Sequence, residues 1–137
     1  MTDVAVSKLL DDFRQGRRFA LARALSMVED ARAGYDTVLA ELHPKLGNAR
    51  RIGITGPPGA GKSTITMRLT AAIRESGLTV GIIAVDPTSP FSGGALLGDR
   101  VRMEAVALDP GVFIRSMATR GSLGGLAATT RELADVF

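Results

Sequence analysis

The chain has 137 residues, a net charge of +3 and 45% hydrophobic residues, which suits one modest domain with a core of its own. It contains no cysteine, which excludes disulfides, thiolate catalysis and cysteine-based metal sites. No basic run alternates with aromatic residues, so we expect no nucleic acid as partner. No apolar run could span a membrane and no signal-peptide pattern opens the chain. We therefore expect a cytoplasmic protein without a membrane partner.

Residues 1–46 are expected to form a helical extension. Apolar residues at three- and four-residue spacing mark two helices. The residues expected to share a face are Leu9, Leu10 and Phe13 in the first helix and Phe19, Ala22, Leu25 and Val28 in the second. A third helix is predicted over 35–42, with His43 as a helix-end residue before a proline. The extension either packs on the domain or serves as an arm that contacts a partner or a second subunit.

The pattern changes at residue 51 to that of an α/β protein. A short apolar strand over 52–55 precedes a glycine-rich turn, and a helix closed by Gly77 follows. The apolar run 78–85 is typical of a strand buried on both faces of a parallel sheet. Together these elements predict one βαβ unit. The apolar stripe expected on the helix consists of Ile65, Leu69, Ala72 and Ile73.

The remaining elements predict a third strand and two more helices. A loop over 86–99 is followed by a helix near 100–108, a Pro-Gly turn and a strand near 112–116. The last helix is expected to place Leu126, Thr130, Leu133 and Phe137 on one face. The expected architecture is a P-loop NTPase domain over 47–137, with an incomplete parallel sheet of about three strands.

The strongest functional signal is a complete phosphate-binding loop, which fits the pattern G-x-x-x-x-G-K-[ST] between a strand and a helix. The predicted nucleotide-binding residues are Gly56, Pro57, Pro58, Gly59, Ala60, Gly61, Lys62, Ser63 and Thr64. The glycines let the backbone turn its N–H groups towards phosphate oxygens, and the helix N-terminus adds partial positive charge. We expect Lys62 to bridge the β- and γ-phosphates, the Ser63 hydroxyl to ligate Mg²⁺, and Thr64 to contact the α-phosphate. The competing interpretation is a glycine turn that merely links strand to helix.

Two aspartates are candidates for the metal. Asp86 ends a predicted strand at the carboxyl edge, where it can hold Mg²⁺ or orient the attacking water, or simply cap the loop that follows. Asp99 is either a helix N-cap or a magnesium ligand. Asp109, before the Pro-Gly turn, is interpreted as a turn residue. Arg115 and Arg120 either reach a phosphate or a partner, or lie on a solvated surface.

Several segments of the chain resemble the methylmalonyl-CoA mutase-associated GTPases of the MeaB/ArgK type. The similar segments are 17–25, 56–64, 85–103 and 113–126. The resemblance implies a homodimeric GTPase that uses GTP/GDP and Mg²⁺ and acts as a chaperone for an adenosylcobalamin-dependent methylmalonyl-CoA mutase. Carried over by position, Lys62 and Ser63 serve phosphate and metal, and Asp86 and Asp99 are the acidic switch residues.

The resemblance covers only the front of such a protein. No Asn-Lys-x-Asp segment that would read guanine follows, and the carboxyl-terminal dimerisation region of the family is absent. We therefore expect residues 47–137 to be the truncated front half of a GTPase domain, with Lys62 and Asp86 as its catalytic residues. Two alternatives stay open: a P-loop kinase that transfers the γ-phosphoryl group to a small molecule or protein, and a nucleotide-binding fragment that hydrolyses nothing.

Overall fold

The computed structural model of the chain describes residues 3–86, 103–118 and 129–137. They belong to two compact units, each described by itself. The helical unit comprises 1–50 together with 127–137, and the sheet unit comprises 51–126. Helices and a parallel strand pair confirm the α/β class. The last helix of the chain belongs to the helical unit, although the sheet unit separates it in sequence from the amino-terminal helices.

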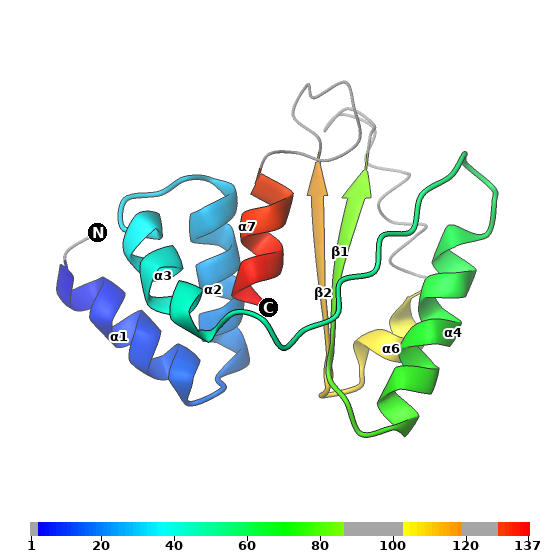
Figure 1. Cartoon of the computed structure of the whole chain (residues 1–137), viewed down its shortest axis with the longest axis horizontal. Coiled ribbons are helices and arrows are strands. Elements are labelled where there is room, and N and C mark those ends of the chain that lie inside the picture. Colours follow the sequence, from blue (N-terminus) through cyan, green and yellow to red (C-terminus); the bar gives the residue numbers. More distant parts are fainter. Residues whose placement is uncertain (1–2, 87–102, 119–128) are drawn as a thin grey trace. The chain divides into compact units, whose positions relative to one another are not determined.

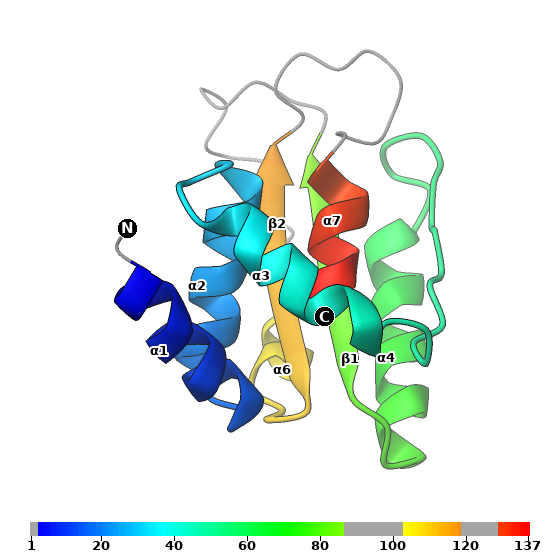
Figure 2. The same ribbon diagram turned by 60° about the vertical axis from the view of Figure 1, so that its left-hand side comes forward.

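The helical unit is built from four α-helices and one short 3-10 helix (Figures 1 and 2). Their bounds are α1 Asp3–Arg14, α2 Arg18–Glu29, α3 Tyr35–Leu42, the 3-10 helix His43–Lys45, and α7 Thr129–Val136. The helix predicted over 35–42 is confirmed at both ends, and His43 does lie where that helix stops. α2 packs against α1, α3 and α7.

The core of the helical unit lies around α2, because its buried residues recur on one side of the helix. They are Ala20, Ala24, Leu25, Met27 and Val28. The expected face was right for Leu25 and Val28 but wrong for Phe19, whose side chain is 56% exposed. Phe19 is the second residue of α2, and the helix turns it away from the side that Ala20 and Ala24 present to α1, α3 and α7. In α7 the buried residues are Leu133 and Val136.

The sheet unit contains two parallel strands, β1 Val80–Asp86 and β2 Val112–Ala118. The strands run in register from the Val80–Val112 pair to the Asp86–Ala118 pair, so their carboxyl ends meet at one edge (Figure 1). α4, Lys62–Glu75, lies against β1, and the short α6, Glu104–Ala107, precedes β2. The predicted strands at 78–85 and 112–116 are thus confirmed with small changes at their ends.

The strand predicted over 52–55 is not formed, which corrects the expected count of about three strands. Residues 51–56 form no strand, and the described part of the sheet has two strands instead of three. An apolar, β-branched segment becomes a strand only when its N–H and C=O groups pair with a neighbour. Here β1 and β2 pair with each other, and residues 51–56 are exposed and outside that ladder. The βαβ unit expected from the sequence is therefore present only as its helix and second strand.

The buried face of α4 only partly matches the expected stripe, because Leu69 and Ile73 are half-buried but Ile65 and Ala72 are exposed. Ile65 is 56% exposed, whereas Thr70 is only 2% exposed. The Thr70 hydroxyl donates to the Thr66 carbonyl at 2.8 Å, and the Thr66 hydroxyl donates to the Lys62 carbonyl at 2.8 Å. A threonine that satisfies its hydroxyl within its own helix can be buried at little cost. Apolar periodicity could not indicate that face, because hydroxyl-bearing residues occupy it.

Several expectations fall outside the described residues. These are the loop after Asp86 including Asp99, the first residues of the helix expected at 100–108, Arg120, and Leu126 of the last expected helix. Within the described ranges, every helix is too short or too polar to cross a membrane.

Candidate functional site

The phosphate loop joins residue 55 to the start of α4 and has the backbone that its glycines allow. Gly56, Gly59 and Gly61 have φ angles of +150°, +77° and +89°, a region that residues with a Cβ rarely adopt. The Ala60 N–H donates to the Pro57 carbonyl at 3.3 Å, which closes a tight turn inside the loop. The whole loop is exposed, so its backbone is accessible to a ligand.

The loop ends in the first turn of α4. Gly61 is the N-cap in left-handed conformation, and its carbonyl accepts the Ile65 N–H at 3.0 Å. The N–H groups of a first helical turn have no acceptor earlier in their own helix, and the helix dipole adds partial positive charge there. The end of α4 that carries the loop thus has the electrostatic character of an anion-binding site.

Lys62 is the first residue of α4, and its side chain folds back over the loop. Its Nζ donates to the carbonyl oxygens of Gly56 and Pro57, both at 2.8 Å. The ammonium therefore lies above the start of the loop, within reach of an anion that the loop backbone surrounds. Ser63 and Thr64 follow in the same turn, Ser63 half-buried and Thr64 exposed.

Asp86 is the last residue of β1 and pairs in register with Ala118 of β2. It lies at the carboxyl edge of the sheet, and α4 begins at the same end of the unit (Figure 1). The fold thus brings the backbone of Asp86 and the phosphate loop to one end of the sheet unit, where open α/β sheets bind ligands. Asp99 lies outside the described residues. Among those that are described, His, Asp and Glu form no cluster of metal-binding type.

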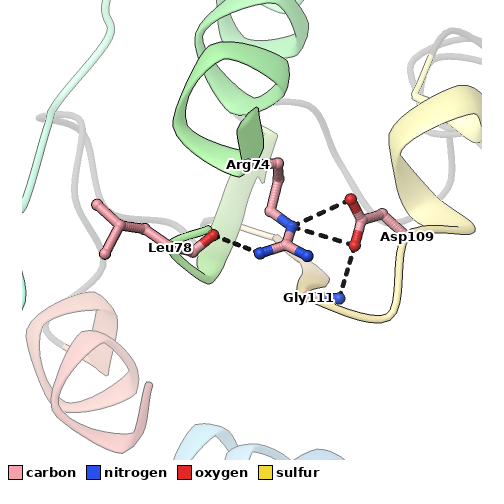
Figure 3. Close-up of polar contacts among 4 residues, drawn as sticks. All are labelled: Arg74, Leu78, Asp109 and Gly111. Carbon is pink, nitrogen blue, oxygen red and sulfur yellow. Dashed lines mark hydrogen bonds and ion pairs between the residues drawn. The ribbon is translucent and has the colours of Figure 1, made fainter. Parts of the chain in front are cut away.

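The opposite end of α4 carries a polar cluster that sequence reasoning missed (Figure 3). The Arg74 Nε donates to both carboxylate oxygens of Asp109, at 3.1 and 3.0 Å, and its Nη1 donates to the Leu78 carbonyl at 2.6 Å. Asp109 also accepts the Gly111 N–H at 2.7 Å, which confirms it as a turn residue. We call these four residues, Arg74, Leu78, Asp109 and Gly111, the Arg74 clasp.

The contacts of the Arg74 clasp lower the pKa of the Asp109 carboxyl. The hydrogen bond from the Arg74 guanidinium, followed by that from the Gly111 N–H, holds the pKa of the Asp109 carboxyl below its ordinary value, although partial burial acts in the other direction. Arg74 and Asp109 are 35 residues apart in sequence, so no local sequence pattern could indicate their contact. Arg115, by contrast, lies half-buried within β2 opposite Ile83.

A glycine-rich loop that leads into a helix, beside the carboxyl edge of a parallel strand pair, is the arrangement of the P-loop nucleotide-binding proteins. The family model described as methylmalonyl Co-A mutase-associated GTPase MeaB matches residues 21–137. The chain therefore belongs to the MeaB family of methylmalonyl-CoA mutase-associated GTPases.

Three relatives illustrate how the similarity extends along the chain. A protein of Pyrococcus horikoshii, whose name provisionally assigns it as a GTPase, is 53% identical over 93% of this chain and 40% of its own length. The GTPase ArgK of Escherichia coli K12 is 38% identical over 97% of this chain and 41% of its own length. The mitochondrial methylmalonic aciduria type A homolog of Mus musculus is 38% identical over 93% of this chain and 34% of its own length. The chain thus spans less than half the length of these relatives.

Proposed function

We propose that this protein binds GTP and GDP through the loop 56–64 and hydrolyses GTP in the presence of Mg²⁺. The observation that carries the proposal is the complete loop, with Lys62 Nζ held above its first two residues by their carbonyl oxygens. Family membership supports guanine as the base, because the matching family and the relative ArgK are named as GTPases.

The residues of the loop fit the phosphates by charge and by shape. The glycine backbone offers N–H donors with no side chain in the way. The space beside Gly59 and Gly61 is open, because a Cβ built at either position would meet no protein atom within 4 Å. The Lys62 ammonium supplies a full positive charge and the start of α4 a partial one. Phosphoryl transfer relies on positioning and charge stabilisation, so these groups are the ones that the reaction needs.

Hydroxyl and carboxylate oxygens are the ligands that Mg²⁺ prefers. We propose Ser63 and Asp86 as the metal-holding residues, with Asp99 as a further candidate from the sequence. Bound Mg²⁺ neutralises developing charge on the phosphate oxygens. In the same proposal Asp86 orients the attacking water, and Lys62 stabilises the negative charge of the γ-phosphate.

We further propose that the nucleotide state of this protein is read by a methylmalonyl-CoA mutase, to which it acts as a chaperone, and that it works as a homodimer. The support is the name of the family that matches residues 21–137. Pull-down of a mutase by the GTP-loaded but not the GDP-loaded protein is the direct test.

The decisive experiment on nucleotide binding is Lys62→Ala, followed by calorimetric titration with GTP, GDP and ATP. We expect the variant to lose at least about a hundredfold in GTP affinity, a loss typical of a charged group that contacts phosphate directly, with an unchanged far-UV CD spectrum. Arg68→Ala removes the same charge from an exposed position of the same helix and is the matched control. Tight GTP binding by Lys62→Ala would overturn the proposal.

Hydrolysis is tested by phosphate release in the absence of any acceptor. Release that needs a small-molecule or protein acceptor would indicate a kinase, and tight binding without release would indicate a binding module. Asp86→Asn and Asp99→Asn should each weaken the Mg²⁺ dependence of triphosphate binding. If both variants instead lowered thermal stability equally with and without nucleotide, the two aspartates would be caps and not metal ligands.

A further inference from the structure

α4 has no fully buried apolar side chain. Of its 14 residues only Thr70 is fully buried, the apolar Met67, Leu69 and Ile73 are half-buried, and Ile65 is more than half exposed. Close-packed side chains are what normally fix the position of a helix on a sheet. Because α4 has few of them, polar contacts at its ends carry more weight in deciding where it lies.

The Arg74 clasp is the polar contact that holds the carboxyl end of α4. Arg74 lies in the last turn of the helix, and its guanidinium reaches the Leu78 carbonyl, two residues before β1, and the Asp109 carboxylate, three residues before β2. Figure 3 shows the guanidinium between these two groups. One side chain therefore ties α4 to the start of both strands of the sheet.

The Arg74 guanidinium packs directly against Gly111. A Cβ built there would overlap Arg74 Cζ, and the nearest atoms all belong to the guanidinium. Gly111 has no positive φ, so its backbone alone would accept an alanine. An alanine at 111 would thus displace Arg74 without removing any charge from the protein.

Arg74 and Lys62 lie on the same helix, twelve residues apart, which corresponds to about 18 Å at 1.5 Å per residue. A helix of this length moves as a rigid element. A tilt or slide permitted at the Arg74 end therefore displaces the Lys62 end, where the loop must meet phosphate. A misplacement of about 1 Å in a catalytic site can cost about a hundredfold in rate.

We propose that Arg74 is a positioning residue for nucleotide binding: by clasping the end of α4 to the starts of β1 and β2, it sets the place of the phosphate loop. The inference rests on the proposed nucleotide-binding function and adds a residue that touches no nucleotide.

The test is titration of the full chain with GDP and with the non-hydrolysable analogue GppNHp, at a temperature where thermal melts show each variant to be folded. Arg74→Ala and Gly111→Ala should each lose about tenfold or more in affinity. Arg74→Lys should lose less, because a lysine keeps the charge and one donor but not the planar fork. The double variant should bind no more weakly than Arg74→Ala, because with Arg74 absent the alanine at 111 displaces nothing.

Arg68→Ala is the control for charge, since it removes a cation from the same helix closer to the loop. A purely structural brace would lower the melting temperature and leave the affinity of the folded protein unchanged. Affinity of Arg74→Ala within about twofold of the unchanged protein, or multiplying losses in the double variant, would overturn the inference. If Arg74→Ala did not fold, Arg74→Lys and Gly111→Ala would decide the question. Lys62→Ala is measured in parallel. If Lys62→Ala still binds nucleotide tightly, the proposed function itself is wrong. If Lys62→Ala loses affinity but Arg74→Ala does not, only the positioning role of Arg74 is wrong.

Discussion

The helical unit and the sheet unit are each stabilised by a different mix of internal contacts. In the helical unit, α2 is lined by fully buried apolar side chains, and Leu133 and Val136 of α7 complete the same core. In the sheet unit the buried apolar residues of the described ranges are fewer, namely Ile82, Met103, Val112 and Met117. In the described part of this unit, the strand ladder and the Arg74 clasp add polar contacts to these apolar ones.

The exposure of the phosphate loop in the sheet unit fits its proposed role in nucleotide binding. The proposed nucleotide-binding residues all belong to the sheet unit, and residues 56–61 of the phosphate loop are exposed. A loop whose N–H groups must meet a ligand cannot satisfy them by packing into a core.

The largest effect on stability is expected in the helical unit. Leu25 is 0% exposed, so Leu25→Ala should lower the free energy of unfolding by about 2–5 kcal/mol, the cost of lost burial plus a cavity. Leu108→Ala in the sheet unit, where the side chain is 87% exposed, should change it by less than about 0.5 kcal/mol. Urea denaturation followed by far-UV CD compares the two. Equal effects would contradict the burial of Leu25 in the core of the helical unit.

Two glycines in left-handed conformation sharpen the comparison. Gly34 caps α3 with φ +93°, and a Cβ there would lie 2.7 Å from Val6 Cγ2 of α1. Gly77 has φ +78° after α4, with open space around its Cα. Gly77→Ala should cost about 1–2 kcal/mol for backbone conformation alone, and Gly34→Ala about 2–4 kcal/mol because overpacking is added. A smaller loss at Gly34 than at Gly77 would mean that α1 and α3 are not closely packed.

The smallest effect concerns acid stability of the sheet unit. Because the folded state lowers the pKa of Asp109, the carboxylate stabilises the fold above its ordinary pKa of 3.8, and this contribution is lost as the pH falls from there through the folded-state value. Asp109→Asn cannot titrate, yet it retains an oxygen for the Gly111 N–H. Its melting temperature should therefore fall less steeply than that of the unchanged protein below pH 4. Parallel curves would show that the Arg74–Asp109 pair contributes nothing to the pH dependence.

Much of the fold could be predicted because its signals are local. The end of the helix at 35–42 was indicated by a proline, and the strands near 78–85 and 112–116 by short apolar runs between turns. The phosphate loop is nine consecutive residues, so its positive φ angles and the start of α4 follow from glycines and a lysine in fixed order. Asp109 as a turn residue belongs to the same class of inference.

The loop, most of the helices and the two strands could therefore be predicted, since each depends on residues within a few positions of one another. Other features depend on long-range packing. The tertiary structure shows that residues 52–55 form no strand, that α4 buries Thr70 and leaves Ile65 exposed, and that α7 joins the amino-terminal helices. It also shows that Arg74 meets Asp109. Strand pairing, the buried face of a helix and an ion pair across 35 residues each depend on which distant segment comes alongside. That choice is made by the free energy of the whole unit, which no single stretch of sequence contains.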